Sequence, residues 1–251
     1  MLSPAMKNAH DRVFVVTAPG FDDRQESARL ALGPDNFEFV FGVNKSSTTI
    51  EELAANGHYD EARAIALDRN DEPMSLGHIC CSLGHQNAYR KIVEYRIARA
   101  LIFEDDIVVN VSDDEKINAA AAAIPEDADL IYWSWQGGEN VTRFAGLEKW
   151  SYKILYRLGR LKLTPVMIDN LYARPYDSNF KVAGKHFWTN AYTVTLAGAE
   201  RLLDLNSPVV LNADKLITYA ILTGAIRGYV SINKFFGQRS SDPNDELGSY
   251  R

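Results

Sequence analysis

The sequence contains little cysteine and no long apolar run. Its only two cysteines, Cys80 and Cys81, are adjacent, so they form no disulfide framework, and neither lies in a metal-ligand spacing. No segment approaches the roughly 18 uninterrupted apolar residues of a membrane span, and residues 1–10 lack the apolar core of a secretory signal. These absences favour a reducing compartment, and we expect a cytoplasmic protein.

An excess of positive charge is also absent. The 27 Lys and Arg residues are outnumbered by 33 Asp and Glu residues, which gives a formal net charge of -6. Because phosphate backbones are bound by a basic footprint, we expect no nucleic-acid partner. The sequence also lacks a glycine-rich phosphate loop and a Walker-type lysine motif, which counts against chemistry on nucleoside triphosphates.

Short apolar runs alternate with helical segments along most of the chain. Residues 13–16 and 37–41 indicate two strands that flank a helical stretch at 25–32, which is a βαβ opening. Further helices are expected over residues 48–68, 76–95, 113–123, 197–205 and 215–222, and further strands over 100–103, 130–135, 191–196 and 228–232. This order predicts an α/β fold with a Rossmann-like, mostly parallel sheet flanked by helices.

The hydrophobic content of 46% is sufficient for a substantial core. The simplest organisation is a single domain over residues 12–237, although the length also allows two small domains. We expect residues 1–11 to be flexible. Residues 238–251 are polar and rich in Ser, Asp and Gly, which is typical of a loop or a lid.

One stretch, residues 143–163, differs in character from the rest. It carries six basic residues against a single acid, Glu148, with aromatic residues between them. Such a stretch can lie on an anionic membrane surface or hold a charged acceptor, and a solvated helix face over the core explains it equally well. We assign residues 143–188 to an acceptor-side insertion, which would allow peripheral contact with the cytoplasmic face of the membrane.

The most informative feature is the apolar strand 100–103, which ends in Glu104, Asp105 and Asp106. Acidic groups at the carboxyl end of a buried strand lie where α/β sheets bind ligands, and such charge is costly without a cation or solvent. Two-residue alternation places Glu104 and Asp106 on one side and Asp105 on the other. Glu104 and Asp106 are therefore candidate ligands for Mg²⁺ or Mn²⁺, while a solvated acidic loop is the competing interpretation.

Three segments together resemble glycosyltransferase family 25, the lipopolysaccharide and collagen sugar transferases, and the match is spread along most of the chain. Residues 76–85, LGHICCSLGH, are similar to the family's Gly-Glu-Ile-Gly-Cys-x-x-Ser-His block, and residues 100–106, ALIFEDD, are similar to its Leu-Ile-x-Glu-Asp-Asp strand end. Weaker support comes from Asp23-Arg24, residues 189–203, Asp214 and Gln238. The chain departs from the family pattern at several positions: His78 replaces Glu, Cys80 replaces Gly, Gly84 replaces Ser, and Thr17-Ala18-Pro19 stands where Asn-Leu is usual.

The resemblance implies a GT-A-type fold, a UDP-galactose or UDP-glucose donor, a divalent cation and inversion at the anomeric carbon. On the donor side we place Thr17, Ala18, Arg24, His85, Asp105 and Gln238, and on the acceptor side His186 and Trp188. Asp214 is the candidate general base.

Each of these assignments has a structural alternative. Asp214 precedes a predicted helix and could serve as its N-cap. Arg24, whose planar fork suits a diphosphate, could instead form a surface ion pair with Asp22 or Asp23. His85 and His186 could be packing residues of the interior.

The sequence therefore predicts a metal-dependent, inverting hexosyltransferase that extends a glycan such as lipooligosaccharide. A non-catalytic nucleotide-sugar or glycan-binding protein of the same fold is the alternative. A metal-dependent nucleotidyltransferase or phosphohydrolase is a third hypothesis, against which the missing phosphate loop counts.

Overall fold

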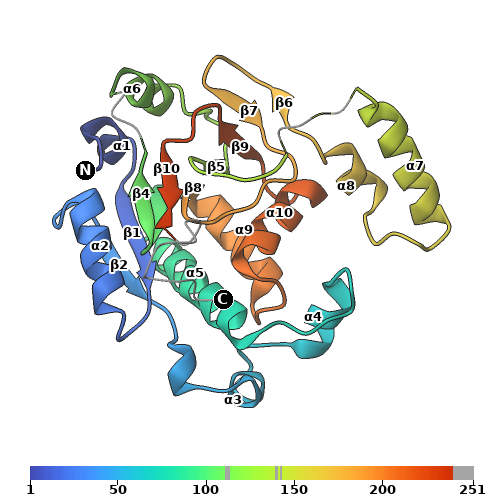
Figure 1. The fold of residues 1–251 in the computed structure, drawn as a ribbon, viewed down its shortest axis with the longest axis horizontal. Helices are drawn as coiled ribbons and strands as arrows, with labels where there is room; N and C mark the ends of the chain where they lie inside the picture. The colour runs from blue at the N-terminus through green and yellow to red at the C-terminus, as the bar shows by residue number, and fades with distance from the viewer. Residues whose placement is uncertain (111–113, 139–140, 142, 240–251) are drawn as a thin grey trace.

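The computed structural model describes residues 1–110, 114–138, 141 and 143–239. Within this part of the chain, one eight-stranded sheet runs through the centre of the molecule (Figure 1). In order across the sheet, its strands are β2 (Glu38–Phe41), β1 (Arg12–Thr17), β3 (Arg99–Glu104), β8 (Ala191–Thr195), β5 (Leu130–Tyr132), β9 (Gly228–Ser231), β7 (Phe180–Val182) and β6 (Arg174–Pro175). A separate ribbon pairs β4 (Ile107–Val109) with β10 (Phe236–Gln238).

The sheet is mixed, but most of its strands share one direction. β1 is parallel to both β2 and β3, and β5 is parallel to β9. β8 lies antiparallel between β3 and β5, and β7 is antiparallel to both β9 and β6. The expected single α/β domain with a mostly parallel sheet flanked by helices is confirmed.

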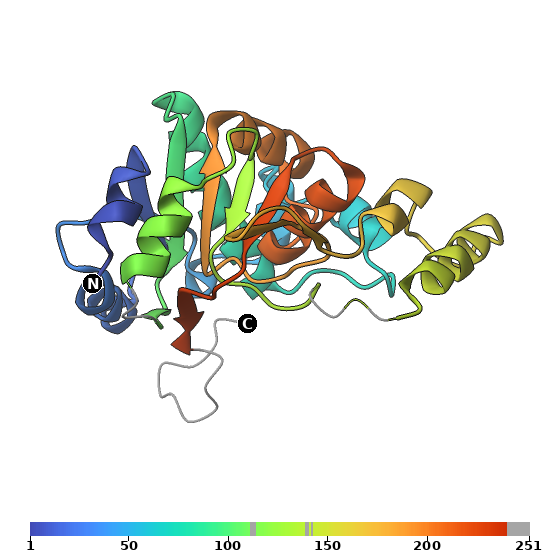
Figure 2. The ribbon, with the colours of Figure 1, turned by 90° about the horizontal axis from the view of Figure 1, so that it is seen from above.

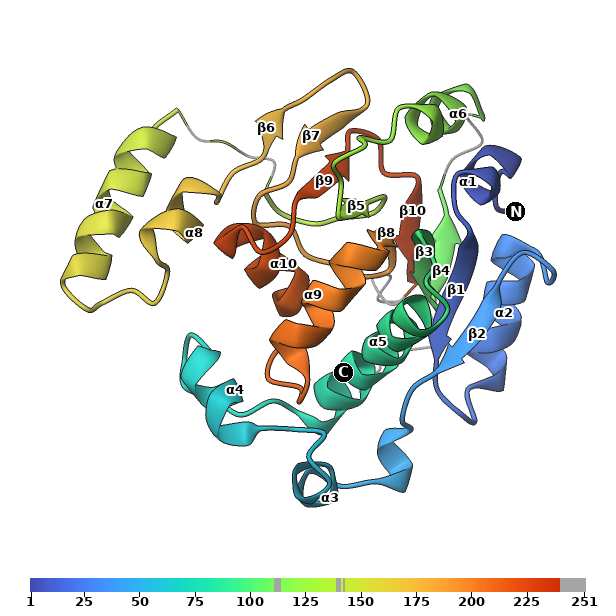
Figure 3. The ribbon, with the colours of Figure 1, turned by 180° about the vertical axis from the view of Figure 1, so that it is seen from behind.

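Helices cover both faces of the sheet, because its central strands are apolar on both sides. Along β1, Phe14 and Val16 belong to one buried cluster while Val13 and Val15 belong to another, as the alternation of side chains along a strand requires. The first cluster is closed by α5 (Leu76–Glu94), α9 (Leu196–Asn206) and α10 (Ala213–Thr223), which lie across the near face of the sheet in Figure 3. The second is closed by α1 (Pro4–Asn8), α2 (Asp22–Leu32), α6 (Asp114–Ala122) and the β4–β10 ribbon.

The N-terminal segment, expected to be flexible, is packed against the domain. α1 buries Met6 completely, and Leu2 joins the same apolar cluster. The buried His10 ties the segment to the sheet: its Nδ1 lies 2.6 Å from the Met6 carbonyl oxygen, and its Nε2 lies 2.6 Å from Thr193 Oγ1. Leu2 and Met6 are the two apolar side chains of this segment that complete the core.

Three other boundaries differ from the sequence prediction. The single helix expected over 48–68 is divided into η1 (Lys45–Ser47), α3 (Ile50–Ala55) and α4 (Glu61–Leu67). Gly57, with φ of +72°, follows α3 in a left-handed conformation that glycine adopts without strain. The strand expected over 130–135 ends at Tyr132. Of the expected C-terminal loop, Gln238 lies in β10, and residues 240–251 are outside the described residues.

Residues 143–169 form an arm that projects from the edge of the domain, as Figure 2 shows for α7 at its far end. The arm contains α7 (Ala145–Arg157), which has no buried residue, and α8 (Pro165–Asp169), which packs against α10. Lys153 joins the two helices of the arm through a 2.7 Å ion pair with Asp169. No helix in the described residues combines the length and the apolar character that crossing a membrane demands.

Candidate functional site

A pocket that opens to solvent lies where the parallel strands β1, β2 and β3 reach their carboxyl ends. This is the edge at which α/β sheets bind ligands. Residues from the N-terminal parts of α5 and α10 also line the pocket. The lining includes the strand-end residues Thr17, Ala18, Gly42 and Glu104, the turn residues Asp105 and Asp106, and the helix residues Arg24, Gly77, His78, Cys81, His85, Asn212 and Asp214.

Asp105 and Asp106 converge on one arginine. Arg24 Nε lies 3.1 Å from Asp105 Oδ1, and its Nη2 lies 3.1 Å from Asp106 Oδ2. Thr17 Oγ1 donates a 2.7 Å hydrogen bond to Asp105 Oδ2. All three charged side chains are at most 9% exposed, so the alternative of a surface ion pair with Asp22 or Asp23 is wrong.

The expected alternation of the three acids fails for a simple reason. β3 ends at Glu104, and Asp105 and Asp106 form the turn that leads to β4. Side chains alternate between faces only while the backbone stays extended. Asp105 and Asp106 therefore reach the same guanidinium instead of pointing to opposite sides.

The pocket holds more negative than positive charge. Four carboxylates line it, those of Glu104, Asp105, Asp106 and Asp214, against one guanidinium, that of Arg24. Burial raises the pKa of Asp105 to about 6, because desolvation outweighs the opposing effects of Arg24 and Thr17. An oxygen-rich site with this excess of negative charge fits a hard divalent cation.

Glu104 and Asp214 are linked by the hydroxyl of Thr189. Thr189 Oγ1 hydrogen-bonds to Glu104 Oε1 and lies 3.2 Å from Asp214 Oδ1. A threonine hydroxyl has one hydrogen to donate, so it can donate to only one of the two carboxylates at a time. This contact brings together three residues from distant parts of the chain.

Asp214 is not the N-cap of its helix. The cap of α10 is Asn212, whose side chain accepts a 2.8 Å hydrogen bond from the Lys215 amide. Asp214 lies in the first helical turn, where negative charge is favoured by the helix dipole. The cap interpretation was wrong, and the side chain of Asp214 points to Thr189 instead.

His85 connects the pocket to the core. It is 1% exposed, its Nδ1 lies 2.8 Å from the Tyr192 hydroxyl, and that hydroxyl lies 2.8 Å from the hydroxyl of Tyr89. On the other side of the ring, Nε2 lies 3.5 Å from Glu104 Oε1. His85 is thus a packed interior residue and a pocket residue at once.

Two glycines let α5 approach the strands that carry the site. A Cβ built on Gly84 would lie 2.7 Å from Val16 Cγ1, and one on Gly42 would lie 2.9 Å from the Gly84 Cα. Any larger residue at either position would push the helix away from β1 and β2. This close approach accounts for glycine at position 84.

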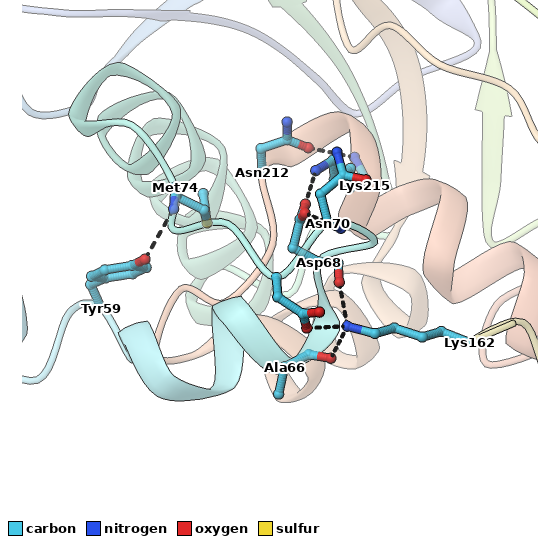
Figure 4. A network of polar contacts seen from close by, with 9 residues as sticks. Tyr59, Ala66, Asp68, Asn70, Met74, Lys162, Asn212 and Lys215 are labelled. Carbon is cyan, nitrogen blue, oxygen red and sulfur yellow. Dashed lines mark hydrogen bonds and ion pairs between the residues drawn. The ribbon is translucent and has the colours of Figure 1, made fainter. Parts of the chain in front are cut away.

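A polar network supports the rim of the pocket (Figure 4). Lys215 forms a 2.5 Å ion pair with Asp68, which holds the pKa of that carboxyl below its usual range. Lys162, at the base of the arm, donates to the carbonyl oxygen of Asp68 and to Asp71. The loop before α5 is thereby fastened both to α10 and to the arm.

The structure brings together most of the predicted site residues but not all of them. Those that line the pocket are Thr17, Ala18, Arg24, His85, Glu104, Asp105, Asp106 and Asp214. Gln238, His186 and Trp188 are not among its lining residues. His186 is fully buried beside the rings of Tyr132 and Trp135, and the Trp188 ring lies under Lys234 Nζ at 5.8 Å.

Sequence reasoning did not single out Thr189, Cys81 or Asn212 as site residues. Asn212 carried a usable signal, since Asn before an apolar helical segment is a common N-cap. Thr189 carried none, because a hydroxyl residue next to a strand has no distinguishing spacing. Cys81 carried a weak signal, because His85 follows it by four residues on the same predicted helix.

The sequence of this chain is similar to those of known proteins. Residues 23–217 match the family model described as "Glycosyltransferase family 25 (LPS biosynthesis protein)". The human "Inactive glycosyltransferase 25 family member 3" is 26% identical over 205 residues, covering 78% of this chain and 29% of that protein. "Procollagen galactosyltransferase 1-A" of Xenopus laevis is 23% identical over 207 residues, covering 79% of this chain and 29% of that protein.

Among solved structures, the "mannose-1-phosphate geranyltransferase" of Thermus thermophilus is similar, with 11% identity and a TM-score of 0.39 over 90% of this chain and 75% of that chain. A TM-score this low does not establish a shared fold. The chain spans less than a third of the length of the curated relatives it matches.

Proposed function

The chain belongs to glycosyltransferase family 25, and from this premise we propose that it is a metal-dependent, inverting hexosyltransferase with a UDP-sugar donor. Galactosyl transfer is favoured by the relatives that are named procollagen galactosyltransferases, and glucosyl transfer is the near alternative. The acceptor we propose is a glycan, with lipooligosaccharide as the first candidate because the matched family is described as an LPS biosynthesis family.

The observation that carries the proposal is the carboxylate-lined pocket at the strand ends. Its four carboxylates exceed its one guanidinium, so Glu104 and Asp106 are the side chains we expect to hold Mn²⁺ or Mg²⁺. A cation bound there would neutralise the charge that develops on the departing diphosphate. Thr17, Ala18 and Asp105 line the pocket at the ends of β1 and β3, where we place the donor.

Asp214 is the carboxylate that we propose as the general base. An inverting displacement needs a group that takes the proton of the acceptor hydroxyl on the face opposite the leaving group. Asp214 lines the pocket from the first turn of α10, and Thr189 Oγ1 lies 3.2 Å from its Oδ1. With its hydroxyl hydrogen on Glu104, Thr189 would leave the Asp214 oxygen able to accept a proton.

The test is transfer of radiolabelled sugar from UDP-galactose and UDP-glucose to truncated lipooligosaccharides. We expect turnover that stops in EDTA and returns with Mn²⁺, that is lost in the double variant Glu104→Ala/Asp106→Ala, and that falls about 10²- to 10⁴-fold in kcat in Asp214→Asn. Glu94→Gln is the matched control, since it removes an exposed carboxylate at the far end of α5, about 24 Å along the helix from His78. Turnover that is indifferent to EDTA would reject the metal, and full activity of Asp214→Asn would reject the base.

A non-catalytic sugar-binding protein is the second candidate function. It is favoured by the human and mouse relatives named as inactive members of the family, at 26% identity. Calorimetry that detects UDP-sugar binding with Mn²⁺, together with no product across the acceptor panel, would replace the first proposal by this one.

For the partners and location of the protein, we propose a glycolipid acceptor and a cytoplasmic position at the membrane face. The arm supplies the surface for this contact. Phe144, Leu147 and Trp150 are each more than 60% exposed, and basic residues lie between and after them along α7. Apolar and basic side chains on one exposed helix suit a surface of anionic lipid.

A further inference from the structure

A second group of metal-binding side chains lies at the wall of the pocket. Ligand atoms of Cys81, His85 and Glu104 all lie within 4.8 Å of one another. Cys81 and His85 are four residues apart on α5, so both face the pocket from the same side of the helix. Glu104 reaches them from the end of β3.

We propose that Cys81, His85 and Glu104 form a binding site for a thiophilic divalent cation such as Zn²⁺. Zinc is bound by Cys, His and carboxylate ligands with tetrahedral geometry, and sites with three protein ligands keep the fourth position open. This set of donors is distinct from the oxygen-only pair, Glu104 and Asp106, that suits Mn²⁺ or Mg²⁺.

The distances fit such an ion. Zinc bonds of about 2.0–2.2 Å to nitrogen and oxygen place two ligands of a tetrahedral site about 3.4 Å apart. His85 Nε2 and Glu104 Oε1 are separated by 3.5 Å. Nε2 has no hydrogen-bond partner among the described residues, although His85 is 1% exposed. A buried ring nitrogen without a partner is costly unless something binds it.

Neighbouring residues hold two of the ligands in position. The Tyr192 hydroxyl lies 2.8 Å from His85 Nδ1 and fixes the ring, and Thr189 hydrogen-bonds to the Glu104 carboxylate. Outer partners of this kind orient metal ligands, and their loss typically lowers affinity about 10- to 100-fold. The spacing argument that set both cysteines aside was therefore wrong for Cys81, because its partner is a histidine one helical turn away.

The two cation sites share Glu104, so we expect the two ions to compete for its carboxylate. A zinc ion held by Cys81 and His85 would take Glu104 away from the cation that we propose to bind the donor diphosphate. Zinc would then act as an inhibitor of the Mn²⁺-dependent reaction. The existence of the zinc site does not depend on that reaction.

Titration of the reduced, metal-stripped protein with Co²⁺ tests the site without any substrate. We expect a thiolate-to-cobalt charge-transfer band, intense visible bands of tetrahedral Co²⁺, and loss of both when Zn²⁺ is added. Cys81→Ser should lose the charge-transfer band, and Tyr192→Phe should weaken binding about 10- to 100-fold. Cys80→Ser is the matched control, and Asp106→Asn should leave the spectrum unchanged.

Absence of the charge-transfer band in the wild type, or its loss in Cys80→Ser with retention in Cys81→Ser, would overturn the proposal. Melting temperatures of all four variants establish that each is folded. A protein that binds Co²⁺ in this way but transfers no sugar would refute the proposed function alone, and one that transfers sugar without a cobalt–thiolate band would refute the zinc site alone.

Discussion

The pocket buries its charges, whereas the arm exposes both its charges and its large apolar side chains. Arg24 and Asp106 in the pocket are at most 9% exposed, and they pair with each other. In the arm, the ion-paired side chains of Lys153 and Asp169 are 38% and 58% exposed, and Trp150 is 61% exposed. A charged side chain that is buried at a strand end must have an ionic or hydrogen-bonding partner, because an unpaired buried charge is costly. Exposed side chains such as those of the arm contribute little to the free energy of unfolding. This difference in exposure is what the proposed contact between the arm and a membrane surface requires.

The largest effect on stability is expected when Arg24 is removed from the pocket. Arg24→Ala leaves the carboxylates of Asp105 and Asp106 buried without their common partner, and loss of one member of a buried ion pair costs about 3–5 kcal/mol. We expect the free energy of unfolding, measured in urea at neutral pH, to fall by that amount.

The control for Arg24→Ala is Arg157→Ala, which removes an exposed arginine from the last turn of α7. It should change the free energy of unfolding by less than about 0.5 kcal/mol. If both substitutions lowered the free energy of unfolding equally, the buried arginine of the pocket would contribute no more to stability than the exposed arginine of the arm.

A second, smaller effect concerns His10, which anchors the N-terminal segment. Burial lowers the pKa of His10 from 6.5 to about 4. A folded-state pKa below the unfolded value gives stability that is complete above about pH 6.5 and is lost as the pH falls toward 4. The loss attributable to His10 amounts to about 3 kcal/mol.

Urea unfolding of the wild type and of His10→Gln at several pH values between 7 and 4 isolates this contribution. The difference between the two proteins is needed because other groups titrate in the same window. Asp105, with its pKa raised to about 6, acts in the opposite sense, since its protonated form is favoured by folding as the pH falls. His58→Gln, at an exposed histidine, is the matched control. An unchanged pH slope in His10→Gln would contradict the anchoring role.

The sequence was sufficient for the sheet but not for the contacts that complete the site. The uninterrupted apolar runs of β1 and of the strand before Glu104 placed the strands and the acidic edge correctly, because these signals are local. The turn at Asp105 and Asp106 was missed, since nothing in three consecutive acids marks where the extended backbone stops. The link from Glu104 through Thr189 to Asp214 spans 85 and 25 residues, and a single sequence contains no signal for such pairs.

Substitutions in the arm should have the smallest effect on the free energy of unfolding and should weaken membrane binding instead. A substitution in the core, Trp133→Ala, gives the comparison. Trp133 is fully buried and donates a 2.7 Å hydrogen bond to Thr193, so Trp133→Ala should cost about 3–5 kcal/mol. Leu147→Ser/Trp150→Ser removes two exposed apolar side chains and should change stability by no more than about 1 kcal/mol in total, about 0.5 for each position.

The same double variant should lose sedimentation with vesicles that contain anionic phospholipid, while the wild type binds them and leaves zwitterionic vesicles unbound. Arg157→Ala/Arg160→Ala tests the charge alone: each basic residue near an anionic surface contributes about 1 kcal/mol, so the pair should weaken binding about 30-fold and reduce its salt dependence. Retained binding in Leu147→Ser/Trp150→Ser together with its loss in Arg157→Ala/Arg160→Ala would mean that the arm recognises charge without inserting side chains. Retained binding in both would mean that the exposed face of α7 is not the membrane contact.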